Sequence, residues 1–240
     1  MIDQSQRIAA RVFAITFFVT LAVIMIGYSR FYGPYIVWDN DEQTAANLAA
    51  HAPAIHIYIC SATIYGVGLL IMLAALYRAL GPVRRGLALF AALCWLMYAT
   101  MWFVFVPDLF GALRTMTGGG RLQVFEPEQL QALAGLQLAS GWDAYYIGLT
   151  FNGIGLVIFS FLFFKSRYIP RALAVLGIVT ALFESACGFA YLVDRSFETI
   201  VSVNYYELPA MFFEVLLGIW ILARGLRTHE TAKLAGGQVS

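Results

Sequence analysis

Long apolar runs alternate with short polar clusters along the whole chain. A membrane-spanning helix needs about 20 mostly apolar residues. None of these runs shows the two-residue alternation of a barrel strand, and helices are the other structure that satisfies every backbone polar group in lipid. The pattern predicts an all-α integral membrane bundle of about six transmembrane helices, at residues 12–28, 54–77, 87–106, 145–164, 172–193 and 208–222.

The composition agrees with a protein that is solvated by lipid. Hydrophobic residues make up 61% of the chain and charged residues 12%, with a mean hydropathy of +0.76. Soluble domains carry about twice that share of charge. The three cysteines all fall inside predicted spans, without metal-ligand spacing, and are expected to be small packing residues.

The basic residues predict the orientation of the bundle, because cytoplasmic loops of membrane proteins are enriched in Lys and Arg. Four of the fifteen Lys and Arg residues belong to the outer connections: Arg30, Arg114, Arg121 and Arg195. The other eleven cluster before the first span, in two short loops and after the last span: Arg7, Arg11, Arg78, Arg84, Arg85, Lys165, Arg167, Arg171, Arg224, Arg227 and Lys233. Both termini are therefore predicted to be cytoplasmic. Topology accounts for these charges, so no nucleic-acid partner is expected.

We expect one transmembrane domain over residues 1–227 and a disordered cytoplasmic tail over 228–240. The first apolar run lacks a small-residue cleavage site and is interpreted as a retained helix. A short helix is predicted near 42–50, with Asp39 or Asp41 as its N-cap. Another helix begins near Glu126 and either lies on the outer surface or continues into the fourth span.

Several stretches resemble a known family in matching order and at similar spacing. They are QRIAAR at 6–11, residues 44–50, KSRYIPRAL at 165–173, YLVD at 191–194, and residues 214–225. In these the chain resembles the DUF4386 family of bacterial polytopic membrane proteins, a domain of unknown function. The resemblance implies a multi-pass fold in the bacterial inner membrane and no particular activity.

Two carboxylates lie deep inside predicted spans, where a charge is costly and by default marks function or a specific partner. Glu184 and Glu214 fall at similar depth on consecutive antiparallel spans, and neither span contains a Lys or Arg. Two carboxylates that approach each other in a low dielectric cannot both ionise cheaply. Polar residues of the other spans gather toward the same, outer half: His56, Tyr58, Ser61, Tyr98, Asp143 and Asn152.

These residues suggest an outward-facing polar pocket that binds or transforms a small lipophilic molecule. Glu184, Glu214 and Asp143 are the candidate catalytic acids and bases, and His56, Tyr58, Ser61, Asn152 and Tyr98 are candidate pocket residues. If the protein is an enzyme, a membrane-embedded lyase, isomerase or cyclase fits such carboxylates. The partners expected are membrane lipids and the lipophilic ligand. No cofactor motif is present, and the oligomeric state is not indicated.

Other interpretations stay open. The two glutamates can be interhelical hydrogen-bonding groups that only stabilise packing. A mixed metal site of His56, Asp143, Glu184 and Glu214 is conceivable, although no metal is predicted. The protein could instead be a proton-coupled transporter, or a structural or regulatory membrane subunit. Aromatic residues near the predicted outer ends form either an interfacial belt or the lining of a pocket: Trp38, Trp102, Trp142, Tyr145, Tyr146, Tyr205 and Tyr206.

The predicted topology is testable by cysteine labelling in a variant without native cysteines. A membrane-impermeant thiol reagent applied outside the cell should modify a cysteine at Gly119, because that loop is predicted to face outward. A cysteine at Arg84 should react only after the cells are permeabilised. The reverse pattern would overturn the predicted orientation.

Overall fold

The computed structural model describes residues 2–38, 40–117 and 120–227, and within them it contains helices and no strand. Six of these helices are long and apolar enough to cross a membrane, which confirms the all-α membrane bundle. Each contains one of the predicted apolar runs: α1 (Gln4–Phe31), α3 (Ala52–Leu80), α4 (Arg85–Thr117), α5 (Pro127–Ser166), α6 (Arg171–Val193) and α8 (Asn204–Arg224). The shorter elements are η1 (Gly33–Tyr35), α2 (Asp41–Ala50), η2 (Gly120–Val124) and α7 (Phe197–Ile200).

Two helices are much longer than their apolar runs. α4 has 33 residues and continues through Pro107, and α5 has 40 residues. The helix predicted to begin near Glu126 is thus continuous with the fourth span. At about 1.5 Å per residue these helices measure roughly 50 and 60 Å, against a hydrocarbon core of about 30 Å. Both therefore continue beyond the lipid interior.

The short helix α2 forms as predicted, but its cap was misassigned. Asn40 is the N-cap, and its Oδ1 accepts a hydrogen bond from the Gln43 N–H at 2.8 Å. Asp41 is the first helical residue, and Asp39 lies outside the described residues. The predicted tail 228–240 and Gly119 also lie outside them.

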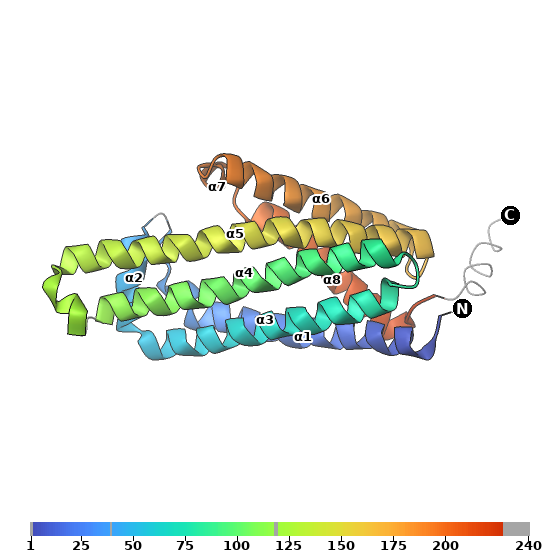
Figure 1. The fold of residues 1–240 in the computed structure, drawn as a ribbon, viewed down its shortest axis with the longest axis horizontal. Helices are drawn as coiled ribbons and strands as arrows, with labels where there is room; N and C mark the ends of the chain where they lie inside the picture. The colour runs from blue at the N-terminus through green and yellow to red at the C-terminus, as the bar shows by residue number, and fades with distance from the viewer. Residues whose placement is uncertain (1, 39, 118–119, 228–240) are drawn as a thin grey trace. The chain divides into compact units, whose positions relative to one another are not determined.

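The chain divides into two compact units, and four of the long helices contribute a segment to each. Unit 1 comprises residues 1–19, 68–98 and 149–240, and unit 2 comprises residues 20–67 and 99–148. Figure 1 follows the chain by colour through α1 to α8.

In unit 1, α6 packs closely against both α5 and α8. A Cβ on Gly153 of α5 would lie 2.8 Å from the backbone oxygen of Ala181 on α6. A Cβ on Gly188 of α6 would lie 3.2 Å from the Cα of Thr150. α6 and α8 are also in contact. These glycines let helix backbones approach at distances that a larger residue would prevent, as is usual between membrane helices.

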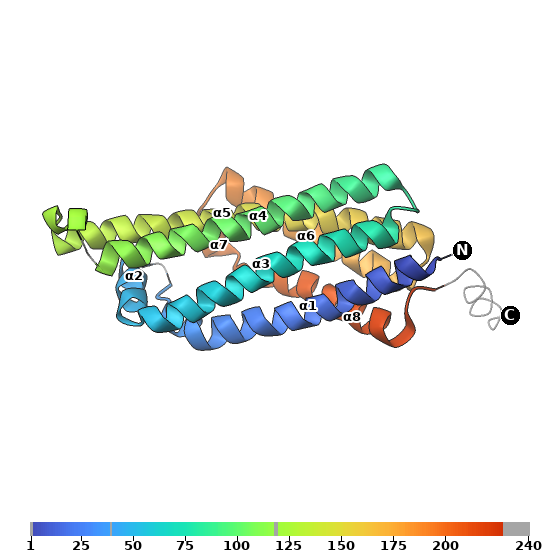
Figure 2. The ribbon, with the colours of Figure 1, turned by 60° about the horizontal axis from the view of Figure 1, so that its bottom comes forward.

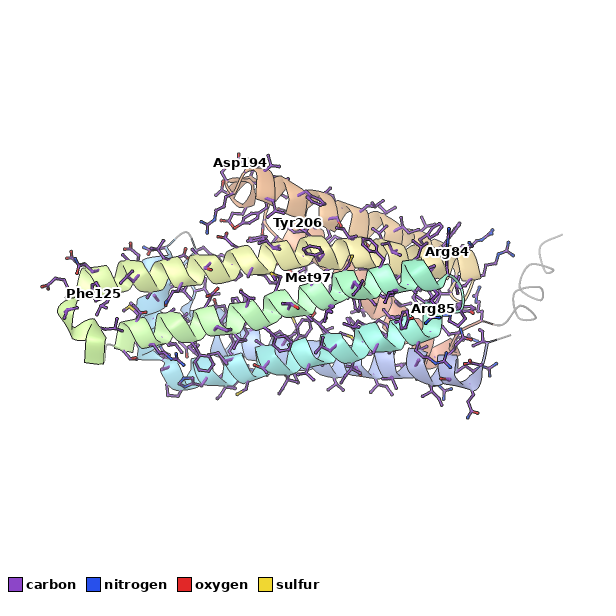
Figure 3. The ribbon with its side chains drawn as sticks, in the orientation of Figure 1. Arg84, Arg85, Met97, Phe125, Asp194 and Tyr206 are labelled. Atoms are coloured by element: carbon purple, nitrogen blue, oxygen red, sulfur yellow. The ribbon has the colours of Figure 1, made fainter. Side chains whose placement is uncertain are left out.

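Arg84 and Arg85 lie far from Asp194 in unit 1. Figure 3 shows Arg84 and Arg85 at one end and Asp194 at the other, where α6 ends. Asp194 accepts hydrogen bonds from the Ser196 hydroxyl at 2.7 Å and the Ser196 N–H at 2.9 Å. Because these donors favour the charged carboxylate, they hold the pKa of Asp194 below its ordinary value.

In unit 2, the second half of α4 runs antiparallel to the first half of α5, side by side in both views (Figures 1 and 2). Glycines again mark the contact: Gly111 of α4 faces Gln137, and Gly141 of α5 faces Phe105. The hydroxyl of Thr115 donates to the side-chain oxygen of Gln137 at 3.2 Å. The two helices are therefore in contact from Phe105 to Thr115 of α4.

The cysteines follow the prediction only in part. Cys94 and Cys187 are buried, as expected of packing residues. Cys60 is exposed on α3, so its predicted packing role was wrong. A position inside a span identifies the medium around a helix, but it does not show which face of the helix meets the lipid.

The close approach of α5 and α6 predicts that Gly153→Ala will destabilise the protein, because the added methyl overlaps backbone atoms of α6. The expected loss is about 1–3 kcal/mol in the free energy of unfolding. Unfolding by denaturant in lipid–detergent mixed micelles measures it. Gly86→Ala on α4 is the matched control, since nothing lies within 4 Å of a Cβ there. Equal stability of the two variants would contradict the packing described here.

Candidate functional site

A carboxylate is completely buried in the middle of α6. Glu184 is 0% exposed, and the side-chain amide of Asn152 on α5 donates to its two oxygens at 3.1 and 3.4 Å. Glu184 forms no ion pair with a Lys or Arg that the structure describes. The Asn152 amide is thus the hydrogen-bonding partner of the Glu184 carboxylate.

The sequence of α6 explains why Glu184 points toward α5. Residues three or four apart share one face of a helix, and Gly177, Ala181, Glu184 and Gly188 follow that spacing. All four are buried. Three are small, so α5 comes close, and Glu184 is the long polar side chain on this face. The Ser185 hydroxyl beside it lies 3.5 Å from the Thr150 carbonyl oxygen, to which it donates.

Asn152 is held in place from its own side. It is 6% exposed, and its backbone carbonyl accepts a hydrogen bond from the Trp95 indole N–H at 3.4 Å. The Trp95 ring is itself fixed by Phe159, at 5.4 Å between ring centroids, and by Phe13, at 6.4 Å. Helices α1, α4 and α5 therefore together position the amide that meets Glu184.

Glu214 lies on α8, which contacts α6. It is half-buried at the edge of a buried stripe that includes Ala210, Phe213 and Leu217. It lies within electrostatic range of Glu184. It accepts no hydrogen bond from any residue in the described part of the chain. The two predicted carboxylates are thus on adjacent helices, one with an amide partner and one without.

Tyr206, at the beginning of α8, joins this group. It is 0% exposed, and its hydroxyl finds no hydrogen-bond partner among the described residues. Its electrostatic neighbours include Glu184 and Glu207. The sequence assigned Tyr206 to an interfacial belt or a pocket lining. The signal that identifies it is the buried stripe of α8, in which Tyr206 precedes Ala210, Phe213 and Leu217 at helical spacing.

The eight predicted site residues divide between the two units. Tyr98, Asn152, Glu184 and Glu214 belong to unit 1, where Glu184 and Asn152 bond directly. Tyr98 is buried. The other four belong to unit 2: His56, Tyr58, Ser61 and Asp143.

Within unit 2, these four residues have different surroundings. His56 is exposed, and its ring centroid lies 5.9 Å from that of Phe110. Tyr58 is buried, and Ser61 donates to the backbone oxygen of Ile57 at 3.0 Å, within its own helix. Asp143 is half-buried.

An aromatic network fills much of unit 2. Tyr32 stacks on Tyr58 at 4.4 Å between ring centroids, and the network continues at 5.7–6.4 Å through Phe105, Trp102, Trp142 and Tyr145. Three buried polar atoms in this unit have no partner among the described residues: the Tyr32 hydroxyl, Trp102 Nε1 and Asp108 Oδ2. Most of these rings lie inside the unit, although Trp38 at its edge is 65% exposed.

The residues that the structure describes include no group of three or more His, Cys, Asp or Glu side chains that could hold a metal ion. The mixed site of His56, Asp143, Glu184 and Glu214 therefore finds no support. The functional groups near Glu184 are the Asn152 amide, the Tyr206 hydroxyl and the Glu214 carboxyl group.

A family model described as a domain of unknown function, DUF4386, matches residues 12–225. The chain belongs to the DUF4386 family. This confirms the resemblance noted in the sequence. No curated protein and no solved structure matches the chain. The DUF4386 match covers α3, α4, α5, α6 and α8 completely and α1 from residue 12, and it includes Asn152, Glu184, Tyr206 and Glu214.

The contact between Asn152 and Glu184 predicts an energetic coupling that a double-mutant cycle can measure. Asn152→Ala and Glu184→Ala each remove one partner of this hydrogen bond and should each destabilise the protein, and the double variant should lose less than the sum. We expect a coupling of about 0.5–2 kcal/mol, the usual range for interhelical hydrogen bonds in membranes. Asn204→Ala, at the exposed start of α8, serves as the control. Strict additivity would mean that the two side chains do not interact.

Proposed function

We propose that this DUF4386 protein resides in the bacterial inner membrane with both termini in the cytoplasm. We further propose that it binds or transforms a small lipophilic molecule at the Glu184 site. The observation that carries the second proposal is a carboxylate fully buried among membrane helices with no described Lys or Arg to pair with. The orientation is supported by the distribution of basic residues.

The cost of the polar groups supports a functional site over simple packing. A buried polar group without a partner costs about 1–3 kcal/mol, and more when it is charged. Asn152 satisfies part of Glu184, but Glu214 and the Tyr206 hydroxyl have no hydrogen-bond partner among the described residues. Leu or Phe would fill the same positions at no such cost. A ligand that bonds to these groups would account for their retention.

The chemistry of the group suits acid–base work on an apolar molecule. A carboxylic acid away from water can donate a proton to a carbon–carbon double bond or to an oxygen, and a carboxylate can take one back. Glu184 is positioned by Asn152, while Glu214 is unrestrained by hydrogen bonds within the described residues. We therefore assign Glu214 to contact with the ligand and Glu184 to acid–base function or polar anchoring. Isomerisation, elimination and cyclisation are reactions of this type.

The residues of unit 1 are sufficient for this proposal. Asn152, Glu184, Tyr206 and Glu214 come from three helices of that unit. The proposal does not require the four sequence candidates of unit 2, which are Asp143, His56, Tyr58 and Ser61.

The proposal predicts that purified protein retains a lipophilic molecule that depends on Glu214. The protein is extracted in lipid nanodiscs, and its organic extract is compared by mass spectrometry with that of empty nanodiscs. Glu214→Gln should reduce the retained molecule at least tenfold, because the amide keeps the shape of the side chain but cannot ionise or exchange a proton. Glu184→Gln should have a similar effect.

Glu128→Gln, in the exposed first turn of α5, is the control and should retain the molecule fully. Circular dichroism and thermal unfolding establish that each variant folds. If all variants retain the same lipophilic molecules in the same amounts, the glutamates serve packing alone.

A further inference from the structure

Three parts of unit 1 that are distant in sequence meet at Gln6. This residue is 2% exposed, and its amide nitrogen donates to the backbone oxygen of Ala79 at 2.8 Å and to the Tyr168 hydroxyl at 3.3 Å. The backbone N–H of Arg227 donates to the Tyr168 carbonyl at 2.8 Å. These three hydrogen bonds form a clasp. It joins the start of α1, the end of α3, the α5–α6 link and the segment after α8.

This clasp gathers exposed cations at one end of unit 1, called the basic end below. The nearby acidic residue, Asp3, is paired with Arg78 at 3.4 Å. Figure 3 shows Arg84 and Arg85 at this end. Its exposed basic residues are Arg7, Arg11, Arg78, Arg84, Arg85, Lys165, Arg167, Arg171 and Arg224.

Aromatic rings hold some of these guanidinium groups. Arg171 lies over the Phe164 ring at 5.4 Å, and Arg227 lies over the Trp220 ring at 4.6 Å. A stacked guanidinium still has N–H groups at its edge that match the geometry of a phosphate. Arg167, in the link between α5 and α6, has a backbone φ of 57°, which is uncommon for a residue other than glycine. At the start of α6, the guanidinium group of Arg171 is thus held against a ring while the residue stays exposed.

Apolar side chains accompany the cations on three helices. Ile15 follows Arg11, Leu89 follows Arg85 and Val175 follows Arg171, each four residues further into its helix. Residues four apart lie on the same helix face. Ile15, Leu89 and Val175 are 55%, 47% and 44% exposed. Arg85 and Arg171 are the first residues of α4 and α6, and Arg11 lies about two turns into α1; each is followed by an apolar surface one turn deeper.

We propose that the basic end binds the phosphate head groups of anionic phospholipids. The cations lie where six apolar helices begin or end, at the depth of the head groups. The exposed Ile15, Leu89 and Val175 then meet the acyl chains of the same molecules. A phospholipid can contact both the cations and these apolar side chains, whereas a soluble polyanion would contact the cations alone. Basic residues near a membrane surface each contribute about 1 kcal/mol to attraction of anionic lipid, or about fivefold in an association constant.

Electron spin resonance on the full chain, reconstituted in phosphatidylcholine, tests this proposal. Spin-labelled phosphatidylglycerol should associate with the protein several-fold more strongly than spin-labelled phosphatidylcholine. Added NaCl should reduce the preference, since salt screens exposed charges. The triple variant Lys165→Gln/Arg167→Gln/Arg171→Gln should remove most of the preference and bring the ratio of the two association constants close to one. The charge-conserving variant Arg167→Lys/Arg171→Lys should keep most of the preference.

Two further variants test whether the lipid preference depends on the arrangement of the basic end or only on the net charge of the protein. Arg30→Gln/Arg114→Gln/Arg195→Gln removes the same number of charges outside the basic end and should leave the preference unchanged. Gln6→Ala removes no charge but opens the clasp, and should lower the preference while circular dichroism shows a folded protein.

Equal association of the two labelled lipids with the native chain would overturn the proposal, as would an equal effect of both triple variants. A DNA oligonucleotide or inorganic phosphate that binds the native chain in phosphatidylcholine, but not the Lys165/Arg167/Arg171 variant, would assign the surface to soluble anions and also overturn it.

Discussion

The close approach of α5 and α6 is the constraint on which the candidate site depends. Membrane helices gain little from burying apolar surface, because lipid is as apolar as their own side chains. Association relies instead on dense packing and interhelical hydrogen bonds. Gly153 and Gly188 permit the packing, and Asn152 and Glu184 form the hydrogen bond within the same interface. If larger residues kept the helices apart, Asn152 could not reach Glu184.

α8 also packs against α6 with the help of glycines. Gly177 of α6 accommodates the Phe213 ring, and Gly218 of α8 accommodates Phe18 of α1. This packing places Tyr206 and Glu214 near Glu184. The group therefore combines a precisely held carboxylate with two polar side chains that the surrounding helices leave unsatisfied. Glu184 thus contributes to helix packing through its hydrogen bond with Asn152, while Tyr206 and Glu214 keep polar groups available for a ligand.

The sequence predicted the spans well because hydropathy measures what lies in lipid. It did not predict that α4 continues past its apolar run and through Pro107 to Thr117, because a proline in an otherwise helical pattern usually marks a helix end. It predicted a helix from near Glu126 but left open whether that helix joins the fourth span, as it does in α5. Glu184 was identifiable because a lone charge stands out in an apolar run, and Asn152 because it is polar at similar depth. Tyr206 was not separated from the other aromatics, because burial depends on which neighbour covers a helix face. The same reason applies to Cys60, whose exposure only the tertiary structure reveals.

The aromatic network of unit 2 has a spectroscopic consequence. Trp38, Trp102 and Trp142, three of the five tryptophans, belong to this unit. Tyr145 lies within 6 Å of both Trp102 and Trp142. Light absorbed by tyrosine passes efficiently to tryptophan at such separations. Much of the light that unit 2 absorbs is therefore emitted by its own tryptophans, and changes confined to the Glu184 group of unit 1 are followed through Trp95 and Trp220, or through a probe placed there.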